Sequence, residues 1–229
     1  MIVTGRMLRS VRPYVELAGL DDPVVCYQGA VVADPATGEF LRHVPIPLAV
    51  AREAIEVIEG DGFATLNCYV DDDLVVSHET SGARAYADFQ HIPLREVGDL
   101  LRWLDRPPTK LVIVDEPETL DVYKPRLLDR FDGRLFIAKS LPFFLELASP
   151  EVSKGSGLAF LAARLGFTPE RTVAFGDGEN DFELLEWAGY GIAVENAHEE
   201  LKRRADWICP GPDEEGVAAV IEAYLAARA

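Results

Sequence analysis

Apolar and polar residues follow a helical period in some stretches of the chain and a strand period in others. Residues 49–58 and 94–104 carry apolar side chains at helical spacing, so we expect two helices there. Residues 64–76 read as two apolar-rich strands around three aspartates, which is typical of a hairpin with a solvated turn. Strands are also predicted at residues 110–114 and 134–138. This mixture indicates an α+β domain.

The last third of the chain has a different pattern. A short apolar run at residues 173–175 ends in a glycine-rich acidic turn, and a helix is predicted from Asn180 onward. Strands near Val24, Thr172, Tyr190 and Asp206 would form a parallel sheet flanked by helices.

Two breaks divide the chain into predicted domains. Residues 45–47 follow an apparent hairpin over residues 24–44, and a second break lies near Pro150. We therefore expect an α/β core built from residues 1–46 and 148–229, with residues 47–147 inserted as an α+β cap domain.

The acidic turn contains two carboxylates, Asp177 and Asp181, four residues apart at the carboxyl end of a predicted strand. Open α/β sheets bind their ligands at that edge. Carboxylate oxygens suit a hard divalent cation such as Mg²⁺, which keeps positions open for water and phosphate. The alternative is that these acids only cap the following helix.

A single lysine precedes the next most informative stretch. Ser153 is a good N-cap, apolar residues follow at helical spacing, and Gly166 is suited to end the helix. Lys154 would then add its charge to the free N–H groups of a helix N-terminus, which favours phosphate binding. The alternative is a solvated surface lysine.

The chain opens with a short apolar run that stops at Thr4 and Gly5. The Thr4 hydroxyl is able to donate a hydrogen bond to a phosphate oxygen. The alternative is that Thr4 only caps a helix that follows the strand.

In this order, and together with the segments at residues 25–30 and 191–202, these motifs resemble the Cof-like branch of the haloacid dehalogenase (HAD) superfamily of phosphatases. The resemblance extends from Met1 to the C-terminus. It implies a HAD-like Rossmannoid parallel-sheet core with a cap that selects the substrate. It also implies two-step phosphoryl transfer, in which an aspartate forms an aspartyl phosphate that water hydrolyses with Mg²⁺ present.

The resemblance assigns roles by position. Thr4 matches the hydroxyl that binds phosphate, and Lys154 matches the basic residue that neutralises the phosphate and the nucleophile. Asp177 and Asp181 match the metal-binding acids, and the cofactor implied is Mg²⁺. The substrate-binding residues implied are Thr4, Gly5, Lys154 and Asn180.

The chain departs from the family at its start. The family opens with a strand ending in DxDGT, which supplies the nucleophile, and no such motif precedes Met1. A strand, turn and helix of roughly 30 residues would fill the gap, so we expect a gene start placed too far downstream and an inactive chain as written. Neither Asp71 and Asp73 in their hairpin nor Asp115, followed by Pro117 at a predicted helix start, replaces the motif. A smaller departure is Gln28, where the family has Asn.

Composition limits the partners. The 39 acidic residues outweigh the 22 basic ones, giving a formal charge of -17, which argues against nucleic acid. No apolar run is long enough for a membrane span and no signal peptide is present, so we expect a cytoplasmic protein. The resemblance implies that the substrate is a small phosphorylated metabolite such as a sugar phosphate. The alternative to a phosphatase is a non-catalytic metabolite-binding or regulatory HAD-like protein. Oligomeric state is not indicated.

Overall fold

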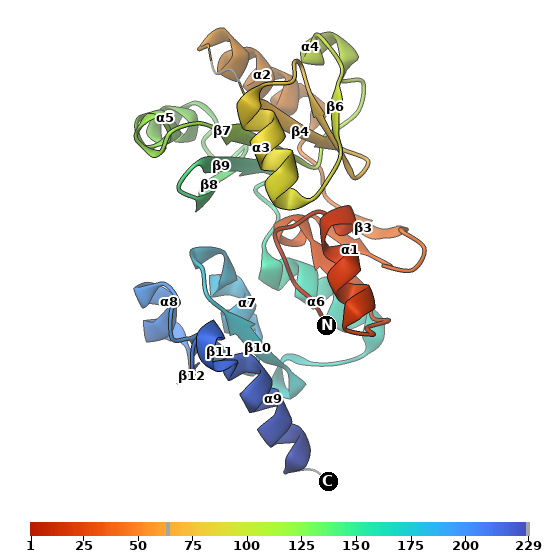
Figure 1. The fold of residues 1–229 in the computed structure, drawn as a ribbon, viewed down its shortest axis with the longest axis vertical. Coiled ribbons are helices and arrows are strands. Elements are labelled where there is room, and N and C mark those ends of the chain that lie inside the picture. The colour runs from red at the N-terminus through yellow and green to blue at the C-terminus, as the bar shows by residue number, and fades with distance from the viewer. Residues whose placement is uncertain (63–64, 228–229) are drawn as a thin grey trace. The chain divides into compact units, whose positions relative to one another are not determined.

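A computed structural model describes residues 1–62 and 65–227. The chain divides into two compact units, Met1–Val152 and Ser153–Ala229, which we call unit 1 and unit 2 and describe separately (Figure 1). Within the described residues, no helix combines the length and the apolar character that a membrane span requires.

Unit 1 begins with helix α1 (Leu8–Leu17) and a small antiparallel sheet. Its strands β1 (Val24–Cys26), β2 (Val31–Ala33) and β3 (Phe40–His43) are neighbours in that order, so the hairpin predicted over residues 24–44 is confirmed. The strand near Val24 was predicted in the parallel sheet, but it belongs to this antiparallel sheet, where it pairs with β2. Tyr27 and Gln28, with φ of 51° and 58°, turn the chain back between β1 and β2.

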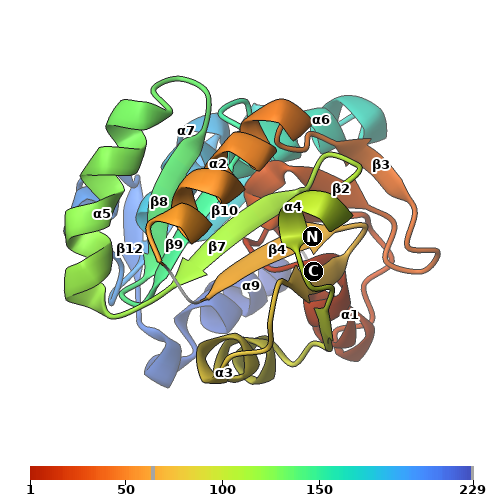
Figure 2. The same cartoon turned by 90° about the horizontal axis from the view of Figure 1, so that it is seen from above.

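The larger part of unit 1 is a six-stranded sheet with the order β6-β5-β4-β7-β9-β8 (Figure 2). Its pairs are antiparallel except β5 with β6. The strands are β4 (Leu66–Val70), β5 (Asp73–Val76), β6 (Leu94–Glu96), β7 (Lys110–Val114), β8 (Phe136–Leu141) and β9 (Phe144–Ala148). The helices are α2 (Leu48–Gly60), α3 (Ser81–Gln90), α4 (Leu100–Trp103) and α5 (Pro117–Arg130).

Both faces of this sheet are covered. On one face, apolar residues of α2, α4 and α5 pack on Leu66, Cys68 and Val70. Figure 2 shows α2 lying across the strands and α5 lying alongside β8. On the other face, residues of α1, β1, β2 and α3 pack with Tyr69 and Val112. Strand residues alternate between the two clusters because successive side chains of a strand point to opposite faces.

Most elements predicted within this unit are confirmed. The helix at residues 49–58, the hairpin in residues 64–76, the strand at 110–114 and the helix starting at Pro117 are all present. Residue 64, where the hairpin prediction begins, lies outside the described part of the chain. The strand predicted at 134–138 begins later, at Phe136.

The helix predicted over residues 94–104 is wrong. Leu94 instead pairs with Leu74 in β6, and only Leu100–Trp103 is helical. Gly98 has a φ of +76°, which interrupts a helix, and the Asp99 side chain then accepts the N–H of Arg102 to start α4.

Unit 2 contains a three-stranded parallel sheet, β10-β11-β12, with strands Val173–Gly176, Tyr190–Val194 and Trp207–Cys209. The predicted strands near Thr172, Tyr190 and Asp206 are therefore confirmed. Its helices are α6 (Lys154–Leu165), α7 (Phe182–Trp187), α8 (Glu199–Arg204) and α9 (Gly216–Ala226). Helix α9 buries only Gly216 among its residues.

Candidate functional site

The turn between β10 and α7, Gly176–Asp181, is called the acid loop below. The Asp181 carboxylate organises this loop, because its Oδ2 accepts the N–H groups of Asp177 and Gly178, each at 3.0 Å. Gly176 is required here, since a Cβ at this position would lie 2.6 Å from the Asp181 Cβ. The loop is therefore folded around one buried carboxylate.

Lys154 is the partner of that carboxylate. Its Nζ donates to Asp181 Oδ1 at 2.5 Å, and Lys154 and Asp181 are only 8% and 2% exposed. The alternative of a solvated surface lysine is wrong. The predicted cap and stop of this helix are confirmed: Ser153 is the N-cap of α6, and Gly166 ends the helix with a φ of 78°. Ser153 also exchanges a reciprocal pair of hydrogen bonds with Ser156, which was not predicted.

Close packing of two helices sets the position of Lys154. A Cβ on Gly155 would collide with the Glu183 carbonyl oxygen, so α6 approaches α7 at this point more closely than another residue would allow. Because Lys154 is the first residue of α6, this contact brings its side chain to the acid loop.

Asp177 has the opposite environment to Asp181. Its side chain is exposed and makes no hydrogen bond or ion pair with the residues that the structure describes. Its main chain is fixed on both sides: the N–H donates to Asp181 Oδ2, and the carbonyl oxygen accepts the His198 N–H at 2.8 Å. A rigid backbone thus presents a carboxylate that is free to bind a ligand.

Of the two acids, Asp177 and Asp181, only Asp177 has oxygens available for a divalent cation. Within residues 1–62 and 65–227, no group of three His, Cys, Asp or Glu side chains is arranged to hold a metal. Asp177 offers free oxygens, whereas both Asp181 oxygens already accept hydrogen bonds. A cation that keeps several waters, as Mg²⁺ does, needs only one or two protein carboxylates. Asp177 fits the role of direct ligand, and Asp181 that of the group shaping the loop.

Asn180 also belongs to the acid loop. It is half-buried, and its Oδ1 faces Gly178, where a Cβ would lie 2.6 Å away. Thus Lys154, Asp177, Asn180 and Asp181 all lie in unit 2, three of them on one loop.

Thr4 and Gly5 lie in unit 1. The Thr4 N–H donates to the Val25 carbonyl oxygen at 2.8 Å, and its Oγ1 accepts the Arg6 N–H at 3.2 Å. Thr4 is not the cap of α1, which begins at Leu8 after Met7. The Thr4 hydroxyl donates no hydrogen bond to the residues that the structure describes, so its proton is available as a donor. Gly5 is closely approached by the side chain of Gln28, so a larger residue there would displace that amide.

The residue that does cap α1 was missed by sequence reasoning. Asp72, in the β4–β5 turn, accepts the N–H groups of Leu8 at 3.1 Å and Arg9 at 2.9 Å, and the Tyr27 hydroxyl at 2.8 Å. The prediction of a merely solvated turn is therefore wrong for Asp72. Burial raises the pKa of this carboxyl, although these hydrogen bonds oppose the shift. Arg9 and Asp72 are 63 positions apart, so no local sequence pattern could have predicted this hydrogen bond.

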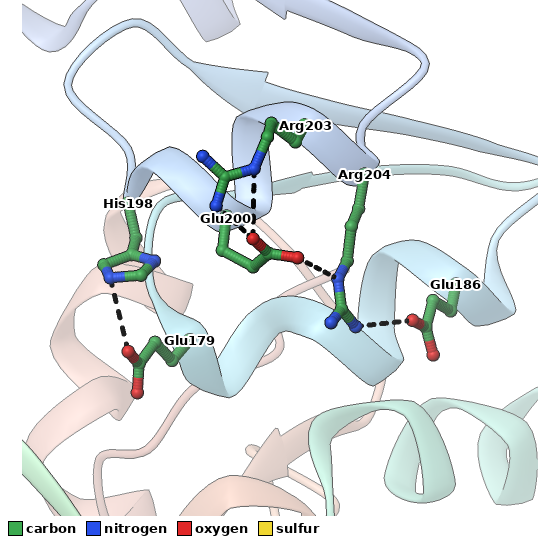
Figure 3. A network of polar contacts seen from close by, with 6 residues as sticks. All are labelled: Glu179, Glu186, His198, Glu200, Arg203 and Arg204. Atoms are coloured by element: carbon green, nitrogen blue, oxygen red, sulfur yellow. Dashed lines mark hydrogen bonds and ion pairs between the residues drawn. The ribbon is translucent and has the colours of Figure 1, made fainter.

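A surface network beside the acid loop was also missed (Figure 3). The His198 Nε2 lies 3.3 Å from Glu179 Oε1, and Arg204 bonds to Glu200 and Glu186 at 3.0 and 3.1 Å. Arg203 also pairs with Glu200. The network joins α8 to α7 and to the acid loop.

The chain resembles known proteins over nearly all its length. A family model described as haloacid dehalogenase-like hydrolase matches residues 1–221. The 5-amino-6-(5-phospho-D-ribitylamino)uracil phosphatase YitU of Bacillus subtilis is 30% identical over 230 residues, which cover 98% of this chain and 84% of that protein. A relative from Streptococcus pyogenes is 36% identical over 116 residues, or 51% of this chain and 43% of the relative.

Solved structures agree. The crystal structure of TM0651 from Thermotoga maritima superposes with a TM-score of 0.83 at 34% identity, covering 95% of this chain and 82% of that one. The predicted α/β fold and the predicted likeness to Cof-like phosphatases are confirmed, and so is the predicted class, the phosphoric monoester hydrolases. The chain belongs to the haloacid dehalogenase-like hydrolase family.

Proposed function

We propose that this protein is a Mg²⁺-dependent phosphatase that acts on a small phosphorylated metabolite such as a sugar phosphate. The observation that carries the proposal is the arrangement in unit 2. A buried lysine at a helix N-terminus is paired with Asp181, and Asp181 in turn holds a loop that leaves the Asp177 carboxylate free.

Each residue has a task in this proposal. Lys154 uses one ammonium hydrogen for Asp181, which leaves two donors and the N-terminus of α6 for a phosphate group. In unit 2, Asp177 would hold the cation and Asn180 would orient the phosphate. The family resemblance also assigns phosphate binding to Thr4 and Gly5, which lie in unit 1. A bound Mg²⁺ would neutralise charge on the phosphate oxygens. Positioning and charge neutralisation of this kind supply most of the catalysis in phosphoryl transfer.

Phosphate release further needs an aspartate nucleophile, and none of the 229 residues stands in a DxDGT motif. We propose that these residues alone are inactive. We also propose that residues 1–46 with 148–229 act as the catalytic core and residues 47–147 as a cap, and that the protein works in the cytoplasm without a nucleic-acid or membrane partner.

The substrate class rests on chemistry and on one relative. The relative YitU is named for a phosphorylated ribitylaminouracil, a small metabolite with a phosphorylated sugar-alcohol chain. Family specificity is set by site contacts rather than by fold, so we extend only the class, a small phosphate monoester, to this chain.

The test combines intact mass and phosphate release. Protein from its source cells is weighed, and any form a few kilodaltons heavier than 25.2 kDa is assayed with p-nitrophenyl phosphate and Mg²⁺ beside the 229-residue chain. We expect release only from a heavier form, and its loss on Asp177→Asn. Turnover by the 229-residue chain that disappears in Asp177→Asn would refute the claim of inactivity.

The alternative is a non-catalytic metabolite-binding or regulatory protein. It predicts a native mass equal to 25.2 kDa, a thermal transition raised by phosphorylated ligands, and no turnover in any form. That set of results would replace the phosphatase proposal.

A further inference from the structure

The acid loop is held from two sides, and only one of them belongs to the sequence motif. Asp181 holds the N–H of Asp177 from within the motif. The carbonyl oxygen of Asp177 is held from outside it, by the main-chain N–H of His198 at 2.8 Å. His198 stands in the turn between β11 and α8, and it is the last residue before α8.

The side chain of His198 reinforces the same contact. Its Nε2 lies 3.3 Å from Oε1 of Glu179, two residues beyond Asp177 in the acid loop (Figure 3). His198 therefore contacts the loop twice, through its backbone at Asp177 and through its ring at Glu179. The His198 and Glu179 side chains are 49% and 69% exposed, so the ring contact is the weaker one.

The turn that carries His198 is itself well anchored. Ala197 is buried and donates its N–H to the Val194 carbonyl oxygen at 2.9 Å, and Leu201 of α8 is fully buried. At the far end of α8, Arg204 reaches Glu186 of α7 and lies over the Phe182 ring at 4.5 Å. A fixed element thus holds His198 against the loop.

We propose that His198 is a positioning residue for Asp177. Its N–H and its imidazole fix the acid loop from the β11–α8 turn, and so set the direction in which the Asp177 carboxylate meets a cation. This inference rests on the metal role assigned to Asp177 in the proposed function. Groups that orient metal ligands in this way typically change metal affinity 10–100-fold when they are removed.

Proline substitution separates the two contacts. His198 has a φ of −55°, which proline adopts, so His198→Pro removes the N–H donor together with the ring. His198→Ala removes the ring but keeps the donor, and His198→Gln restores a side-chain donor for Glu179. Glu199→Pro is the matched control, because it places proline at the first residue of α8, where the N–H has no partner within the helix.

Two measurements are made on the 229-residue chain. Electron paramagnetic resonance of free Mn²⁺ gives the affinity for the metal alone, and hydrogen exchange gives the protection of the amides at residues 177–179. We expect His198→Pro to weaken Mn²⁺ binding about tenfold and to speed that exchange, with the melting temperature little changed. His198→Ala should weaken binding about twofold, and His198→Gln and Glu199→Pro should match the parent.

The outcomes separate this inference from the proposed function. If His198→Pro leaves both Mn²⁺ affinity and loop exchange at parent values, the inference is overturned. If the parent binds no Mn²⁺ or Asp177→Asn binds it equally, the metal role fails, and faster loop exchange in His198→Pro still supports the positioning contact. Should His198→Pro not fold, equal values for His198→Ala and the parent in both measurements overturn the inference.

Discussion

Each unit of this protein buries one lysine against one carboxylate, and the two pairs differ in their surroundings. In unit 1, Lys110 Nζ lies 3.3 Å from Glu146 Oε2 and also over the rings of Tyr27 and Tyr69. In unit 2, Lys154 is paired with Asp181 at 2.5 Å. Lys110 and Lys154 are 4% and 8% exposed, so burial alone does not distinguish them.

The difference lies in what the carboxylate does next. Glu146 is in the middle of β9, within a sheet covered on both faces. Asp181 instead holds a loop whose neighbouring carboxylate, Asp177, is exposed and unpaired among the described residues. A buried ion pair becomes a candidate site when it organises free ligand groups, and it is only structural when it does not.

The largest effect on stability should come from Lys110→Met. The change leaves Glu146 buried without its partner, which costs about 3–5 kcal/mol when a buried pair is broken. Urea unfolding of unit 1, monitored by hydrogen exchange, measures this loss of stability. Lys139→Met is the control, because Lys139 pairs with a well-exposed Asp121 and should cost under about 1 kcal/mol. Equal losses in the two variants would contradict the structural role of the Lys110 pair.

The same pair predicts a dependence on alkaline pH. Burial by itself would lower the pKa of Lys110, but Glu146 and then Tyr86 raise it above its usual value. A raised lysine pKa contributes stability that is fully present below the unfolded pKa and is lost as pH rises through the folded pKa. The stability of unit 1 should therefore fall above about pH 10.4, the usual lysine pKa, and less so in Lys110→Met. If the stability of unit 1 depends on alkaline pH in the same way in the parent and in Lys110→Met, this prediction is refuted.

Asp181→Asn should destabilise unit 2 by about 2–3 kcal/mol, because charge-assisted hydrogen bonds to Lys154 and to two backbone N–H groups are weakened. Hydrogen exchange at the acid loop should rise at the same time. Asp206→Asn, which affects a single bond to the Gly191 N–H, is the control with a smaller loss. Unchanged loop exchange would show that Asp181 does not organise the loop.

Asp72 is a third carboxylate, and it accepts hydrogen bonds from two backbone N–H groups and a tyrosine hydroxyl with no lysine partner among the described residues. Asp72→Ala removes the cap of α1 and should cost about 1–2 kcal/mol in the unfolding free energy of unit 1. Asp73→Ala, next to it, loses one exposed pair with Arg9 and should cost under about 1 kcal/mol. The reverse order would count against the cap.

Sequence patterns predicted what is local in this molecule. Ser153, Lys154 and the Asp177–Asp181 spacing lie within single turns, where residue type and backbone geometry are coupled, and their places in the fold followed from that. The roles of Asp72 and His198 depend on segments that meet only after folding. The helix prediction for residues 94–104 was wrong because leucines at helical spacing also suit a strand followed by a short helix. The positive φ of Gly98 separates the strand from the helix.

The proposed metal-binding role of Asp177 is tested most directly by measuring Mn²⁺ binding by the parent chain and by Asp177→Asn. The Asp177 side chain has no partner among the described residues, so the substitution should change the unfolding free energy by less than about 0.5 kcal/mol. We expect the parent to bind one Mn²⁺ and Asp177→Asn to lose this site while remaining folded. Equal Mn²⁺ binding by the two proteins would contradict it.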